Sequence, residues 1–238
     1  MRRPGSKPKD KHLILFPGFM CDEELWSEVV PGLDPEWTLH HANLFEDPSI
    51  EEMAARVLLE APQSFVMAGF SMGGFVAREI AHTAPERVED MALIATSARG
   101  STRKEIERSK QLQHATHYRG FHGLSLSTIQ KSFHFSRQGD MKLTMRIKKM
   151  ADRLGTAAFK NQIAATRQDG HGRLSELRCP TFVIAGDSDP LRPEAETSAL
   201  ADGIPFARYE IIDRCGHMIP LEQPEALSWK LNDWLRDL

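Results

Sequence analysis

The chain has 238 residues, of which 41% are hydrophobic and 26% charged, and its formal net charge is −3. This length suits one α/β domain with an insertion, and the nearly balanced charge gives no case for nucleic-acid binding. Three scattered cysteines lack a pairing pattern and metal-ligand spacing, which favours a cytoplasmic protein without a metal site. No apolar run is long enough to span a membrane, so no membrane partner is expected.

Residues 1–10 are basic and rich in Pro, Gly and Lys, and we expect a disordered tail there. After it, short apolar runs that end in turn residues predict strands, and apolar positions at helical spacing predict helices. The predicted strands are residues 12–16, 37–41, 65–70, 88–96, 181–185 and 206–212. The predicted helices between them are residues 22–30, 49–60, 72–84, 193–200 and 224–235. This alternation favours a parallel sheet with helices on both sides.

Residues 98–176 interrupt the alternation, because they lack clear strands. Helical patterns stand at residues 104–113, 125–131, 141–154 and 156–167. We expect a helical cap inserted into a core made of residues 11–97 and 177–238.

The predicted cap is basic. The segment from Arg99 to Lys149 has twelve Lys and Arg against three acidic residues, a net charge of about +9, so the remainder carries about −12. Such a charge would attract an anionic substrate or an acidic acyl-carrier protein. Basic side chains are also typical of the solvated faces of surface helices, and both interpretations stay open.

The stretch around Ser71 is the clearest chemical motif. Gly69-Phe70-Ser71-Met72-Gly73 stands between a predicted strand and a predicted helix, which is the setting that gives a G-x-S-x-G pattern its meaning. A sharp turn there strains the backbone of Ser71, exposes its hydroxyl and aims a helix N-terminus at it. Such a serine can attack a carbonyl carbon when a base takes its proton.

The base and the acid that orients it are expected after later strands, in the chain order Ser, acid, His. Asp189 and His217 each follow a predicted strand and fit this order. Asp187 is a rival acid, and Asp before Pro is also a common turn residue. Taken together, Ser71, Asp189 and His217 predict a catalytic triad.

An oxyanion hole requires two backbone N–H donors near the developing negative charge. We predict that Met72, directly after the serine, supplies one donor. Phe19, in the loop after the first strand, is predicted to supply the other, because Gly18 lets the backbone approach closely. A simple strand-ending turn at Pro17-Gly18 is the alternative.

Several motifs together resemble those of the α/β-hydrolase superfamily. They are LFPGFMCD at 15–22, GFSMGG at 69–74, APERV at 84–88, GDSDP at 186–190 and GHMIPLEQP at 216–224. The resemblance covers nearly the whole chain outside the cap, and is closest to small capped carboxylesterases and to enol-lactone or carrier-ester hydrolases. In that family the acid usually lies three positions after the strand-ending Gly, which favours Asp189 over Asp187.

Two features depart from the family pattern. The usual His-Gly pair before the oxyanion donor is Pro17-Gly18 in this chain. The chain also starts too late for the family's first two strands, so the resemblance implies an α/β-hydrolase fold with about six mostly parallel strands.

The resemblance implies a serine hydrolase that cleaves a small-to-medium carboxylic ester through an acyl-enzyme, without a cofactor. C–C bond hydrolases, lyases, thioesterases, lactonases and carrier-protein ester hydrolases share the fold and triad, and a non-catalytic binding protein usually lacks a triad member. Apolar cap side chains are expected either to contact substrate or to form the core of the cap, namely Phe121, Phe133, Phe135 and Met145. The oligomeric state stays open.

Overall fold

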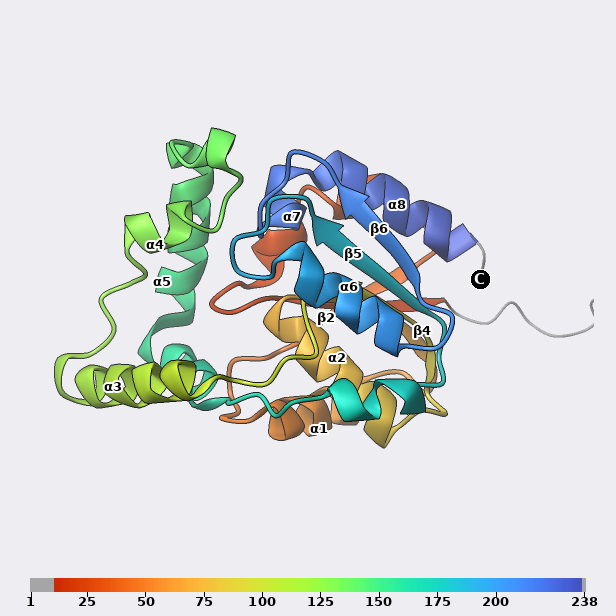
Figure 1. Ribbon diagram of the computed structural model, residues 1–238, viewed down its shortest axis with the longest axis horizontal. Coiled ribbons are helices and arrows are strands. Elements are labelled where there is room, and N and C mark those ends of the chain that lie inside the picture. The colour runs from red at the N-terminus through yellow and green to blue at the C-terminus, as the bar shows by residue number, and fades with distance from the viewer. Residues whose placement is uncertain (1–10, 237–238) are drawn as a thin grey trace, which may run out of the picture.

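Six parallel strands form one sheet in the computed structural model, which describes residues 11–236 (Figure 1). Across the sheet their order is β2-β1-β3-β4-β5-β6. The strands are β1 (His12–Phe16), β2 (Thr38–His41), β3 (Phe65–Phe70), β4 (Val88–Ile94), β5 (Thr181–Gly186) and β6 (Arg208–Ile212). The predicted parallel sheet of about six strands is therefore confirmed. The tail predicted at residues 1–10 lies outside the described residues.

Helices connect the strands. The α-helices are α1 (Ile50–Glu60), α2 (Met72–Thr83), α3 (Arg103–Arg119), α4 (Leu126–Gln130), α5 (Met141–Ala164), α6 (Glu194–Gly203), α7 (Ile219–Glu222) and α8 (Pro224–Arg236). The 3₁₀ helices are η1 (Glu23–Trp26), η2 (Val30–Gly32), η3 (Phe135–Arg137) and η4 (His171–Glu176). No helix within residues 11–236 combines the length and the apolar character needed to cross a lipid bilayer.

Each face of the sheet carries its own apolar core, because successive residues of a strand point to opposite faces. On β1, Leu13 and Leu15 pack in the core beneath α8. Ile14 and Phe16 pack on the other face, in the core beneath α1, α2 and α6. The inner strands are buried on both faces, which is why they read as continuous apolar runs.

The helix predicted at residues 22–30 is present as two short 3₁₀ helices rather than as one continuous helix. The segment winds instead as η1 and η2, through successive i→i+3 backbone hydrogen bonds. Asp22 caps it as predicted, by accepting a hydrogen bond from the Glu24 N–H at 3.0 Å. The tighter winding buries Leu25 and Trp26 completely, and this tertiary packing decides the geometry of so short a segment.

Helices α3, α4 and α5 lie together beside the carboxyl ends of the strands (Figure 1). The two helices predicted at 141–154 and 156–167 both lie within α5, where the non-helical backbone of Gly155 (φ 69°) separates them by a kink. After α5 the chain returns along the sheet, and Leu174 in η4 is buried in the core beneath α6. We therefore propose that the cap ends near residue 164 rather than at residue 176.

Candidate active site

Ser71 occupies a strained turn between β3 and α2, with φ 51° and ψ −109°. The end of β4 holds the turn, because the Ser71 N–H donates to the Ile94 carbonyl at 2.9 Å and Thr96 Oγ1 donates to the Ser71 carbonyl at 2.8 Å. A side chain at Gly73 would place its Cβ 2.6 Å from the Phe16 carbonyl oxygen. Only glycine therefore lets α2 begin so close to β1.

His217 joins Ser71 to Asp189. Its Nε2 lies 2.9 Å from Ser71 Oγ, and its Nδ1 lies 2.7 Å from Asp189 Oδ2. The second carboxylate oxygen of Asp189 accepts the N–H groups of Leu191 at 2.7 Å and Arg192 at 2.8 Å. Asp189 is therefore fixed as an acceptor toward Nδ1, which leaves Nε2 free to accept the serine proton.

Asp187, the rival acid, has a different set of partners. Its carboxylate accepts the N–H groups of Arg214 at 2.8 Å and Cys215 at 3.0 Å. Burial opposes ionisation, but these hydrogen bonds outweigh it and lower the pKa of Asp187. Asp187 thus braces the loop that carries His217, whereas Asp189 contacts the imidazole itself.

The two predicted oxyanion donors lie on either side of Ser71. Met72 provides the first N–H of α2, and Phe19 follows Gly18, whose ideal Cβ would lie 3.5 Å from Ser71 Cβ. Within residues 11–236, neither the Phe19 N–H nor the Met72 N–H donates a hydrogen bond to another residue. Both donors are therefore available to a substrate oxygen.

The sequence did not reveal that the cap holds the loop of Phe19 in place. The N–H of Met20, next to Phe19, donates to Gln162 Oε1 of α5 at 2.8 Å, and Gln162 Nε2 donates to the Leu44 carbonyl at 2.9 Å. Gln162 is 142 residues from Met20, so no local pattern could have indicated this contact.

A cavity of about 530 Å³ lies between the cap and the core and includes Ser71, His217, Phe19 and Met72 in its wall. Its apolar lining from the cap is Ile106, Leu112, Leu124, Ile129, Ile147 and Ile163. Among the described residues, no group of three His, Cys, Asp or Glu side chains is placed to bind a metal ion.

None of the four cap residues expected from the sequence is among the residues that line this cavity, and the packing of two of them favours the alternative role in the apolar core. Phe133 is buried in the core between the cap and the sheet, whereas Phe135 is 75% exposed. Phe121 stacks on Phe159 with ring centroids 4.4 Å apart, and Met145 points outward, 38% exposed. The rotation of each cap helix, which composition does not encode, decides which side chains face inward.

Glu222 connects the cap to the loop of His217. This buried carboxylate accepts the N–H of cap residue His134 at 2.8 Å and the N–H of Met218 at 3.0 Å. The cap carbonyl of Ser132 in turn accepts the His217 N–H at 2.8 Å. Burial raises the pKa of Glu222 despite these hydrogen bonds. Glu222 is thus a positioning residue for the histidine loop.

Glu222→Ala is expected to lower the free energy of unfolding by about 3 kcal/mol, because two buried N–H groups lose their acceptor. Glu222→Gln, which keeps one acceptor oxygen, should lose less. Urea unfolding would measure both, and kcat of the folded variants should fall more than KM rises. Glu225→Ala, on the exposed start of α8, is the control and should change stability by less than about 0.5 kcal/mol. A Glu222→Ala variant as stable as the control would contradict this role.

Comparison with known proteins agrees with this geometry. The alpha/beta hydrolase fold family matches residues 16–224. The chain belongs to this family. The family match confirms the resemblance and the α/β-hydrolase fold that the sequence predicts.

Several named proteins are similar to this α/β-hydrolase. The pimeloyl-[acyl-carrier protein] methyl ester esterase of Aromatoleum aromaticum is 27% identical, over 94% of this chain and 98% of its own. A thermophilic esterase from Thermogutta terrifontis, solved with malate bound, has a TM-score of 0.86 at 24% identity over 95% of this chain and 90% of that one. The enol-lactonase from Burkholderia xenovorans has a TM-score of 0.85 at 20% identity, over 96% and 92%. At these low identities, the two solved structures support the fold alone.

Proposed function

We propose that this chain is a serine esterase that hydrolyses a carboxylic ester through an acyl-enzyme. The proposal rests on the hydrogen-bonded series Ser71–His217–Asp189, which opens into the cavity. The esterase names of its relatives support it.

In the first half-reaction, Ser71 Oγ attacks the ester carbonyl carbon while His217 Nε2 takes the hydroxyl proton. The N–H groups of Phe19 and Met72 donate to the oxyanion. His217 then gives its proton to the departing alkoxide, so the alcohol leaves and an acyl-serine remains. In the second half-reaction, His217 takes a proton from water, which attacks the acyl carbon. Ser71 Oγ then leaves, regains its proton from His217, and the free acid departs.

A fluorophosphonate probe tests the proposal, because it phosphonylates only an activated serine. Mass spectrometry should locate the label on the peptide that contains Ser71. p-Nitrophenyl esters of increasing acyl length should be turned over with a burst of nitrophenol. Labelling without ester turnover would instead favour C–C bond hydrolysis or a lyase reaction on the same triad. The absence of labelling would overturn the proposal and favour a binding protein.

A carrier-linked ester is the second candidate substrate. Several curated relatives are named pimeloyl-[acyl-carrier protein] methyl ester esterases. Part of the positive charge of the cap is neutralised by ion pairs with the core, for example Arg146 with Glu24 and Arg153 with Asp22.

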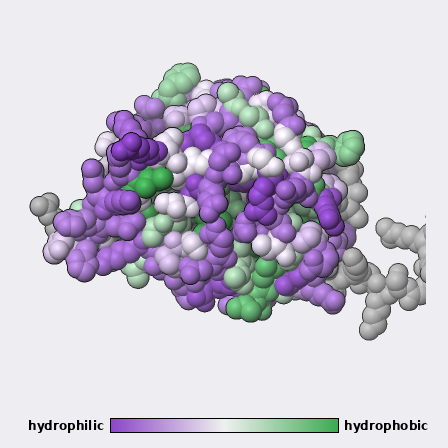
Figure 2. All heavy atoms as spheres, turned by 60° about the horizontal axis from the view of Figure 1, so that its bottom comes forward, coloured by the Kyte–Doolittle hydropathy of each residue, from purple (hydrophilic) through white to green (hydrophobic). Residues whose placement is uncertain are grey.

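Three cations on α3 do stay unpaired within the described residues. They are the exposed side chains of Lys104, Arg108 and Lys110, and Arg108 also lies in the cavity wall. Figure 2 shows a mainly hydrophilic surface on its left side, the side on which α3 lies in Figure 1. An acidic carrier is therefore proposed to approach along α3.

The carrier candidate is tested with a pimeloyl methyl ester presented on an acyl-carrier protein or on free pantetheine. We expect the carrier-linked ester to have the higher kcat/KM at low salt, and this advantage to shrink as salt screens the charges. Lys104→Glu combined with Lys110→Glu should remove it, whereas Lys142→Glu, an exposed cap lysine away from the cavity, should not. Equal kcat/KM for both esters would restrict the proposal to small esters.

We also propose that the protein works in a reducing compartment such as the cytoplasm. Cys21, Cys179 and Cys215 are all buried free thiols. Burial raises the pKa of Cys21 to about 12 and that of Cys179 to about 11. Such thiols stay protonated and unreactive, which supports a structural role for them.

A further inference from the structure

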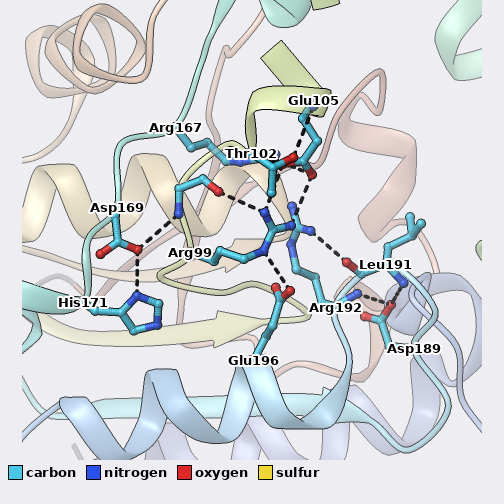
Figure 3. Close-up of polar contacts among 11 residues, drawn as sticks. Arg99, Thr102, Glu105, Arg167, Asp169, His171, Asp189, Leu191, Arg192 and Glu196 are labelled. Atoms are coloured by element: carbon cyan, nitrogen blue, oxygen red, sulfur yellow. Dashed lines mark hydrogen bonds and ion pairs between the residues drawn. The ribbon is translucent and has the colours of Figure 1, made fainter. Parts of the chain in front are cut away.

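Three arginines from separate parts of the chain converge on one wall of the cavity (Figure 3). Arg99 follows β4, Arg167 follows α5, and Arg192 follows the loop of Asp189. Two carboxylates accompany them, Glu105 of α3 and Glu196 of α6. The cluster therefore has one positive charge more than it has negative charges.

Arg99 forms ion pairs with both carboxylates. Its Nε donates to Glu196 at 2.8 Å, and its Nη1 and Nη2 donate to Glu105 at 3.0 and 3.2 Å. The guanidinium of Arg99 lowers the pKa of Glu105 to about 2, as expected for a fully formed pair. These ion pairs connect the cap to the core, and they leave Arg99 with little capacity for another anion.

Arg167 and Arg192 keep unused donors. Arg192 is only 8% exposed, yet its single recorded side-chain partner within residues 11–236 is the carbonyl of Leu191 at 2.8 Å. Arg167 has one weak side-chain contact, from Nη2 to Glu105 at 3.3 Å. The Nε–H groups of both arginines are buried without any acceptor. Burial and mutual repulsion lower the pKa of Arg167, and burial is the main cause that lowers the pKa of Arg192.

Phe75 holds the two guanidinium groups near each other. The guanidinium carbons of Arg167 and Arg192 lie 5.2 and 5.9 Å from the centroid of its ring, within cation–π range. A buried donor without an acceptor is costly, and a structural role in joining cap to core would have paired the Nε–H groups of Arg167 and Arg192 as it paired that of Arg99. Unused, oriented guanidinium donors in a cavity wall match the planar geometry of a carboxylate.

We propose that Arg167 and Arg192 form an anion subsite, the arginine subsite, which binds a free carboxylate of the substrate beside the reacting ester. The inference rests on the proposed esterase function and narrows its substrate class to half-esters of dicarboxylic acids. Arg192 also donates its backbone N–H to Asp189. The subsite therefore adjoins the acid of the triad, and a carboxylate bound there lies in the same cavity as Ser71.

The test compares mono-p-nitrophenyl esters of C4 to C8 dicarboxylic acids with the matched ω-carboxamide esters, which have the same length without the charge. The wild type should favour the acid ester in kcat/KM by about tenfold or more at one chain length, as expected for a charged hydrogen bond in a cavity. Arg192→Gln and Arg167→Gln should each remove most of this preference, so that the ratio of kcat/KM for the acid ester to kcat/KM for the carboxamide ester falls toward one. Arg178→Gln is the matched control, because Arg178 is an exposed arginine outside the cavity. It should leave the preference for the acid ester unchanged.

Equal kcat/KM of the wild type for acid and carboxamide esters would overturn the subsite while leaving the esterase proposal intact. Calorimetry with free dicarboxylates provides a readout independent of turnover. Binding to wild type that weakens about tenfold in Arg192→Gln would support the subsite even if no ester were hydrolysed. Binding that is unchanged in Arg192→Gln, in a variant shown by circular dichroism to be folded, would overturn it.

Discussion

Ser71→Ala is expected to lower kcat for p-nitrophenyl esters by about 10³-fold or more. The substitution removes only Oγ, whose recorded partner is His217 Nε2. The attacking atom is lost, while the N–H groups of Phe19 and Met72 and the walls of the cavity stay in place. Backbone strain at φ 51° is similar for serine and alanine, so urea unfolding should give nearly the wild-type stability.

The control for this substitution is Ser198→Ala, on the outer helix α6, where the hydroxyl is 3.5 Å from Asp202. It should keep wild-type turnover and label fully with the fluorophosphonate probe. Ser71→Ala should not label at all. If Ser71→Ala retained more than about a tenth of wild-type turnover, nucleophilic catalysis by Ser71 would be excluded.

Much of the fold and the convergence of Ser71, His217 and Asp189 were predictable because the decisive features are local. A strand, a glycine-flanked turn and a helix follow one another in the sequence around Ser71. The close approach of Gly73 to Phe16 explains why glycine is required at position 73. Asp189 and His217 each follow a strand, and parallel strands bring their carboxyl ends to one edge of the sheet. Chain order therefore translates into proximity.

The residues that line the cavity were not predictable in this way. Phe133 and Phe135 are two residues apart and equally apolar, yet one is buried and the other is 75% exposed, and neither lines the cavity. The burial of each side chain depends on how the cap packs against the rest of the chain. Contacts such as Glu222 with His134, 88 residues apart, are set by that packing.

The charge of the cap illustrates the same limit. Counting residues gives a basic segment, but the fold pairs Arg146 with Glu24 and Arg153 with Asp22, more than a hundred positions away. Within the described residues, exposed cations without an ion pair include Lys104, Arg108 and Lys110 on α3. Beside the cap, the Nε–H groups of Arg167 and Arg192 are buried without an acceptor. The net charge of a segment thus overstates the charge available to a ligand.

Asp189→Asn is expected to lower kcat by about 10³- to 10⁴-fold, and the hydrogen-bond pattern explains why. The N–H groups of Leu191 and Arg192 both donate to one carboxylate oxygen, so the carbonyl oxygen of asparagine must take that position. Its NH₂ group then faces His217 Nδ1, which must act as an acceptor. The imidazole proton moves to Nε2, and His217 can no longer take the proton of Ser71.

Asp187→Asn is the matched control, because it makes the same change two residues away. Its carboxylate serves Arg214 and Cys215, so asparagine leaves one backbone N–H unsatisfied and should cost about 1–2 kcal/mol of stability. The imidazole keeps its partner, so kcat should fall by less than about tenfold. Stopped-flow turnover of a p-nitrophenyl ester, with urea unfolding, would measure both variants. A larger loss of kcat in Asp187→Asn than in Asp189→Asn would transfer the acid role to Asp187, since the two substitutions differ only in which one contacts His217.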